Sequence, residues 1–181
     1  MLCQAYAAPA PEIQESTAAP RLVPQSNRLD TLAVPDEVMA TCSASLYRDP
    51  ADLQPCMQAI EIAPDGNAAQ QVGKARLQSA LALQYAKRGD LVQARLNINN
   101  ALHRAPTDWV VRAHEGNIYI YESEFAAALA AFDDALRAAP SPPPALFLNR
   151  SLALRALGQY DAAQLDYQRF IDARQAPQAS R

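Results

Sequence analysis

The sequence of 181 residues has little glycine, little histidine and no strong charge of either sign. It contains 5 glycines, 2 histidines and 1 tryptophan, but 14 prolines. Few glycines in an alanine-rich chain disfavour a glycine-rich sheet protein and favour helices separated by proline-marked turns. The 16 basic and 19 acidic residues give a net charge of −3, and the basic residues are scattered. Because phosphate binding needs a concentrated basic surface, nucleic acid is not expected as the main partner.

Long apolar runs are also missing. No stretch approaches the roughly 20 apolar residues that a helix needs to cross a bilayer, so the sequence predicts no membrane span. The length suits one domain with a sizeable core, or one domain with a tail.

Cysteine occurs only three times. Cys42 and Cys56 lie 14 residues apart in a predicted helical hairpin, whereas Cys3 lies in the amino-terminal segment. Two packed antiparallel helices can bring such a pair within disulfide geometry. A disulfide closing this loop would stabilise the fold by roughly 3 kcal/mol. The alternative is two buried free thiols that pack as small hydrophobic side chains.

The middle of the chain repeats itself. Seven positions recur 34 residues later, where Leu81, Ala82, Tyr85, Ala94, Ile98, Ala101 and Pro106 are followed by Glu115, Gly116, Tyr119, Ala128, Phe132, Ala135 and Pro140. A third copy, at an offset of 35, includes Leu154, Ala163, Tyr167 and Phe170. Apolar residues three and four apart within each copy predict two helices with facing apolar stripes. The small residues let these helices approach closely, so each copy predicts one packed helical pair.

The repeat predicts an all-α array of helical pairs at 75–106, 109–140 and 144–175, with a flexible carboxyl terminus at 176–181. Residues 35–66 are predicted to form a further hairpin, a degenerate repeat or cap that begins at Pro35. Pro64 and Pro106 are 42 residues apart, eight more than the period. The helix that follows Pro64 is therefore either longer than the others or preceded by a loop.

Residues 1–34 contain many prolines and small polar residues and no periodic apolar face, so we expect disorder there. The segment Ala5–Tyr6–Ala7 has the small-x-small form of a signal-peptidase site. Export to a bacterial periplasm is the favoured interpretation, with Cys42 and Cys56 as partial support. It requires a start upstream of Met1, because the basic and apolar regions of a signal peptide are missing. The alternative is an ordinary flexible start of a cytoplasmic protein.

The three copies resemble the tetratricopeptide repeat family, whose 34-residue unit has the layout W-x2-L-G-x2-Y, A-x3-F, P. The resemblance covers residues 75–174 and, more weakly, 35–64. It implies a right-handed α-solenoid of helix-turn-helix units. Glu115 departs from the pattern because it stands where leucine is expected. It is expected either to face a partner or to form an ion pair with Arg112.

In this family the first helices of successive units line a concave groove that binds peptides or protein segments. The resemblance places Lys87, Asn117, Tyr121, Leu148, Leu152 and Arg155 in this groove, with Ser79, Leu83 and Ala113 beside them. Amide, basic and apolar side chains of this kind suit a peptide backbone, acidic groups and apolar side chains, respectively. The implied function is a non-enzymatic scaffold that binds a protein or peptide partner. The alternative for each of these residues is solvated surface.

Patterns for catalysis, metal or cofactor binding are incomplete. Gly66 and Gly73 are too far apart for a phosphate loop, and Ala75 lacks the hydroxyl that would hold magnesium. The residue four positions after His114 is Ile118, so the zinc-protease pair of histidines is missing. Adjacent Asp133 and Asp134 diverge by about 100° on a helix and are predicted to be a solvated face. The sequence therefore predicts no enzyme, no cofactor and no metal site.

The last predicted helix lacks a following repeat and contains Leu165, Phe170 and Ile171. Repeat arrays normally end in a unit with a polar outer face. The alternative function is therefore structural, a homo-oligomer that forms through this helix.

Overall fold

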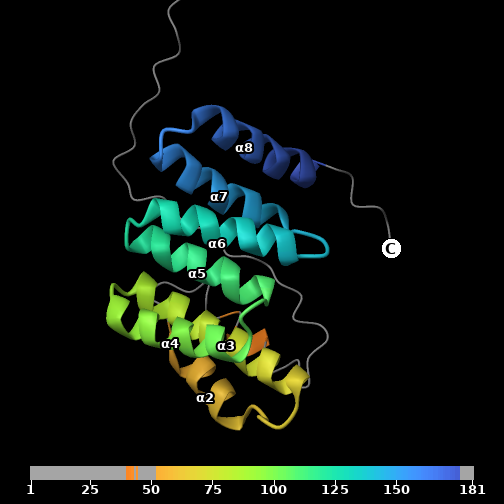
Figure 1. Ribbon diagram of the computed structural model, residues 1–181. Helices are drawn as coiled ribbons and strands as arrows, with labels where there is room; N and C mark the ends of the chain where they lie inside the picture. Colours follow the sequence, from red (N-terminus) through yellow and green to blue (C-terminus); the bar gives the residue numbers. More distant parts are fainter. Residues whose placement is uncertain (1–39, 43, 45–51, 176–181) are drawn as a thin grey trace, which may run out of the picture.

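The computed structural model describes residues 40–42, 44 and 52–175 (Figure 1). Every regular element within these ranges is an α-helix, which confirms the all-α prediction. The segments 1–34 and 176–181, for which disorder or flexibility was predicted, and the Ala5–Ala7 site lie outside the described residues.

The labelled helices stack in chain order, from α2 at one end to α8 at the other (Figure 1). They are α2 (Gln54–Ile62), α3 (Ala68–Lys87), α4 (Leu91–Arg104), α5 (Trp109–Tyr121), α6 (Phe125–Ala138), α7 (Pro144–Ala156) and α8 (Tyr160–Gln175). The closest packing is within the pairs α3–α4, α5–α6 and α7–α8. Further contacts of α4 with α5 and of α6 with α7 join successive pairs. This is the predicted helical repeat array.

Side chains at the helix starts explain where the helices begin. The Asn67 side chain accepts a hydrogen bond from the Gln70 backbone at 3.0 Å, and the Gln70 side chain accepts one from the Asn67 backbone at 3.1 Å. This reciprocal capping box starts α3 at Ala68. α3 is therefore a helix of 20 residues, and the longer of the two predicted alternatives is the one observed. Asp90 and Asp108 cap α4 and α5 without a reciprocal bond, because their carboxylates accept hydrogen bonds from backbone N–H groups of the first turn.

The turn between the two helices of each pair uses one residue with positive φ. Gly89 has φ 82° and Gly158 has φ 75°, but the corresponding residue of the middle pair is Ser123, with φ 62°. In this conformation the Cβ of any residue other than glycine approaches the backbone closely and costs free energy. Ser123 is thus a locally strained position that the repeat itself identifies.

Replacing Ser123 with glycine is expected to raise the free energy of unfolding by about 0.5–1 kcal/mol. The relief of backbone strain exceeds the extra entropy that glycine loses on folding. Chemical denaturation followed by circular dichroism measures the change. Gly89→Ser is the matched variant and should lower the stability by a similar amount. A destabilised Ser123→Gly protein would show that the serine side chain makes a stronger contribution than the strain.

Glycine has a different role in the α5–α6 crossing. A Cβ added at Gly116 would lie 2.6 Å from the ring of Phe132, closer than real contacts allow. Phe132 is fully buried in this crossing. The absence of a side chain at Gly116 therefore makes room for the aromatic ring that fills the space between the two helices.

Cys42 and Cys56 are buried against α3. Their sulfur atoms lie at disulfide distance, and their Cα atoms are 4.4 Å apart. They share one apolar cluster with Leu77 and Leu81 of α3. The pair thus joins Cys56 of α2 to Cys42, which precedes α2 in the chain. Both cysteines pack against α3.

Candidate functional site

Three of the groove residues implied by the family resemblance lie along one face of α7. Leu148, Leu152 and Arg155 are spaced four and three residues apart, so their side chains follow one stripe of the helix. Leu148 and Leu152 are partly exposed, and Arg155 is exposed. We call these three residues the α7 stripe. It offers two apolar side chains followed by a positive charge.

Asn117 lies deeper than the α7 stripe. Its side chain is 1% exposed, and its Oδ1 accepts a hydrogen bond from Nδ2 of the buried Asn149 at 2.9 Å. The pair joins α5 to α7. A peptide could reach the Asn117 amide only if the pair separated, so in this conformation Asn117 fixes the position of α7 beside α5.

The other two groove residues lie at helix ends. Tyr121, the last residue of α5, is half buried and packs against the two apolar clusters that involve α3. This burial raises the pKa of the Tyr121 phenol. Lys87 is exposed at the last residue of α3. The predicted groove residues are therefore not equally accessible, and the α7 stripe is the most accessible continuous part.

Polar contacts that the sequence pattern did not indicate join α3 to α5. Arg76 donates to both carboxylate oxygens of Asp108, from Nη2 to Oδ2 at 2.7 Å and from Nε to each oxygen at 3.1 Å. Ser79 Oγ lies 2.8 Å from His114 Nδ1, and both residues are buried. Burial lowers the pKa of His114 from 6.5 to about 4, while the Asp108 charge raises it and the Arg76 charge lowers it. His114 is therefore a neutral part of the core at pH 7.

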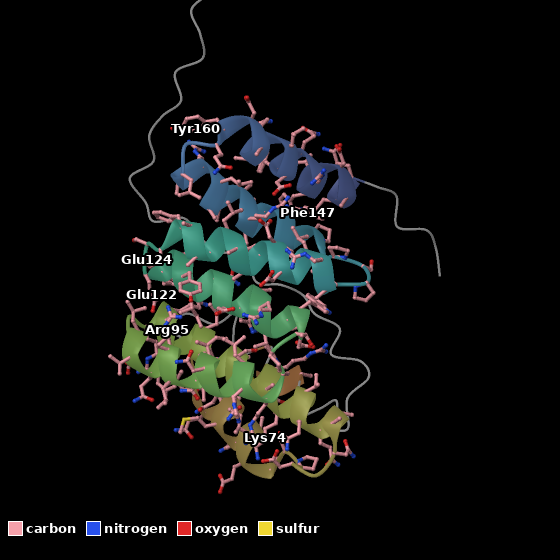
Figure 2. All side chains as sticks on the ribbon, in the orientation of Figure 1. Lys74, Arg95, Glu122, Glu124, Phe147 and Tyr160 are labelled. Atoms are coloured by element: carbon pink, nitrogen blue, oxygen red, sulfur yellow. A yellow bond between two sulfur atoms is a disulfide. The ribbon has the colours of Figure 1, made fainter. Side chains whose placement is uncertain are left out.

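Two further ion pairs involve α5 or the residue that follows it. Arg95 of α4 pairs with Glu122 just beyond α5, and its guanidinium lies 4.4 Å from the ring centroid of Tyr119 (Figure 2). Arg112 pairs with Glu115 at 3.0 Å, so the ion-pair alternative predicted for Glu115 is the one observed. The Arg95–Glu122 pair joins α4 to the end of α5, whereas the Arg112–Glu115 pair lies within α5.

Arg150 connects three helices. It donates to Asp166 of α8 from Nε at 2.6 Å and from Nη2 at 2.8 Å, and to Asp133 of α6 from Nη1 at 2.7 Å. The side chain of Asp166 is 2% exposed, whereas that of Asp133 is 43% exposed. The prediction that Asp133 and Asp134 form a solvated face therefore omitted the contact of Asp133 with α7.

Residues 144–177, which include α7 and α8, match the family model described as tetratricopeptide repeat. This last helical pair is therefore a tetratricopeptide repeat. No curated protein matches the chain.

Tetratricopeptide repeats are typical of protein–protein interaction modules without catalytic activity. In the part of this repeat protein that the structure describes, no three acidic, histidine or cysteine side chains gather where they could hold a metal ion. None of its described helices is both long and apolar enough to cross a membrane.

Proposed function

We propose that this repeat protein binds a short segment of a partner protein along the α7 stripe. The observation that carries the proposal is the accessible row formed by Leu148, Leu152 and Arg155 on the first helix of the matched repeat. A segment with apolar side chains and an acidic group complements this row. The apolar contacts would supply most of the affinity, and Arg155 would fix the direction of the bound segment.

The position of α5 beside α7 supports this proposal. Asn117 and Asn149 hold the two helices together, and Tyr121 lies one helical turn beyond Asn117 while Leu152 lies about one turn beyond Asn149. Because α5 and α7 are each followed by an antiparallel return helix, they run in the same direction. Tyr121 therefore lies towards the same end of its helix as Leu152 and is the second candidate contact for the bound segment.

The side chains of the α7 stripe also determine which segments would bind poorly. Leu148 and Leu152 offer no charge to a highly acidic ligand, and Arg155 would be unfavourable beside a basic one. We therefore expect a segment with two apolar residues about one helical turn apart and an acidic residue on the side of Arg155.

Leu152→Glu is expected to weaken the binding of such a segment at least tenfold. A glutamate there removes an apolar contact and introduces a charge that repels the acidic group of the ligand. Peptides selected from a random display library against the full chain would serve as probes, with affinity measured by fluorescence polarisation.

Val92→Glu is the matched control, because Val92 is highly exposed on α4. This helix makes no contact with α7. The Val92→Glu variant should leave peptide binding unchanged. Far-ultraviolet circular dichroism checks that both variants keep their helices. If the selected peptides bind Leu152→Glu as tightly as the original protein, the binding surface lies elsewhere.

A further inference from the structure

The second helix of each pair has three apolar positions in the same register. They are Leu91, Ile98 and Leu102 on α4, Phe125, Phe132 and Leu136 on α6, and Tyr160, Tyr167 and Ile171 on α8. The spacing of seven and four residues places each set on one face of its helix. We call the last set the α8 outer face.

The first two sets are enclosed by the first helix of their own pair and by the next helix together. The α4 set packs in one cluster with Val111 and Ile118 of α5. The α6 set packs in one cluster with Leu146 and Ala153 of α7. In both cases the next helix supplies two apolar residues seven positions apart to the cluster. This packing of a second helix against the first helix of the next pair therefore occurs twice in the chain.

In the third set the two tyrosines are exposed and Ile171 is partly exposed. Ile98 and Phe132 are 0% exposed, but the corresponding Tyr167 is 45% exposed and Tyr160 is 67% exposed. α8 forms the end of the stack, and Tyr160 lies at its beginning (Figures 1 and 2). Phe170 is buried, and its ring centroid lies 6.3 Å from that of Tyr167. The α8 outer face therefore continues an interface that the chain has already formed between α4 and α5 and between α6 and α7.

Tyr167 stands where α4 has Ile98 and α6 has Phe132. Tyrosine suits a face that is exposed to water until a partner binds. A tyrosine ring supplies apolar area, while its hydroxyl can remain hydrated at the rim. Tyrosine is also enriched at protein interfaces and among the residues that contribute most to binding.

Charges beside the α8 outer face restrict what can cover it. Asp161 and Asp172 are exposed and lie on the same flank of α8, about 100° and 120° from the direction of Tyr160. A second copy packed antiparallel about a two-fold axis near Tyr167 would bring Asp161 of one α8 close to Asp172 of the other. Such like charges disfavour a symmetric dimer through this face.

The contact between α6 and α7 indicates that a helix covering the α8 outer face carries a positive charge. Across the covered α6 face, Arg150 of α7 pairs with Asp133 at 2.7 Å. The α8 residue 35 positions after Asp133 is Gln168, whose side chain donates to Asp172 at 2.7 Å. A basic residue placed as Arg150 is placed would therefore meet Asp172.

We infer that the α8 outer face is a docking site for an amphipathic helix of a partner protein. This helix presents two apolar residues seven positions apart and a basic residue on the flank that faces Asp161 and Asp172. It lies on α8 as α5 lies on α4 and as α7 lies on α6. The site is separate from the α7 stripe and extends the array by one helix.

The chain itself provides a probe of this chemistry. A fluorescent, helix-stapled peptide with the sequence of residues 144–157 contains Leu146, Ala153 and Arg150. Fluorescence polarisation with the full chain should show saturable binding that Tyr167→Asp weakens at least tenfold. A peptide with Arg150 changed to glutamate should bind the original protein at least tenfold more weakly.

Leu165→Asp is the matched control, because Leu165 is 64% exposed on the same helix but about 160° away from Tyr167. It should leave peptide binding unchanged, as should Leu152→Glu in the α7 stripe. Tyr160→Asp provides a second variant of the outer face should Tyr167→Asp lose helicity.

Three results would overturn the inference. They are a lack of saturable binding by the unchanged 144–157 peptide, equal binding of this peptide by the original and Tyr167→Asp proteins, and equal binding of the two peptides by the original protein. Sedimentation equilibrium tests whether a second copy of the chain, and not a partner protein, covers the α8 outer face. A dimer that Tyr167→Asp dissociates and Leu165→Asp preserves would assign the face to self-association and would also overturn the inference.

Discussion

Replacing Arg150 with alanine is expected to lower the free energy of unfolding of the carboxyl-terminal repeat by about 3–5 kcal/mol. Arg150 holds the almost fully buried carboxylate of Asp166 through two hydrogen bonds and also contacts Asp133. Removal of one partner from a buried ion pair leaves a charge that is neither hydrated nor neutralised, and this costs more than the intact pair contributes. The hydrogen bond with Asp166 also raises the pKa of Arg150.

The remaining contact of Asp166 would compensate only in part. Arg169 lies 3.1 Å from Asp166, but its side chain is 57% exposed. Since an exposed ion pair contributes at most about 1 kcal/mol, Arg169 is not expected to replace Arg150. α8 contacts only α7 among the labelled helices, so the loss should appear first as opening of α8.

Hydrogen exchange of α8 amides, together with urea unfolding followed by circular dichroism, measures this loss. Asp166→Asn should cost less, because Arg150 then keeps Asp133 as a partner and no buried charge remains. The double variant Arg150→Leu with Asp166→Leu should recover most of the stability, because it removes both charges together. A loss below about 1 kcal/mol in Arg150→Ala would show that water reaches Asp166 in the native state.

The repeat period allowed most of the architecture to be predicted from the sequence. Helical pairs follow from apolar residues three and four apart, and the close crossing of α5 and α6 follows from Gly116, because a small residue is the local requirement for close approach. Such features depend on residues near one another in the sequence or one period apart. The sequence pattern therefore contains them directly.

The polar contacts between helices were not predictable in the same manner. Arg150 and Asp166 are 16 residues apart, which is neither a helical spacing nor the repeat period. Asn117 was predicted by the family resemblance to face a bound peptide, and the structure places it against Asn149. A helical register gives the direction of a side chain, but the length and chemistry of the neighbouring side chain decide whether it is covered.

His114 illustrates the same limit and leads to a pH prediction. In the sequence it was considered as part of a metal motif, but in the structure it is enclosed between α3 and α5 beside Ser79. Since the Ser79 hydroxyl donates to the backbone oxygen of Arg76, the imidazole Nδ1–H donates to Ser79 Oγ. Burial is the main cause of the lowered pKa, since the charges of Asp108 and Arg76 act in opposite directions.

The fold is therefore expected to lose about 3 kcal/mol of stability from His114 as the pH falls from about 6.5 to about 4. In this range the unfolded chain binds a proton at His114 that the folded chain excludes. The stability associated with neutral His114 is complete above pH 6.5, decreases as the pH falls towards 4, and decreases no further below the folded pKa.

Urea unfolding of the original protein and of His114→Gln, at half-unit steps between pH 7 and pH 4, isolates this contribution. Glutamine keeps a hydrogen-bond donor for Ser79 but cannot take up a proton. Carboxylates titrate in both proteins, so their effect cancels in the difference between the two curves. That difference should change by about 3 kcal/mol in favour of His114→Gln as the pH falls. Parallel curves would mean that His114 can be protonated within the folded protein, which would require water or a compensating carboxylate to reach the α3–α5 interface.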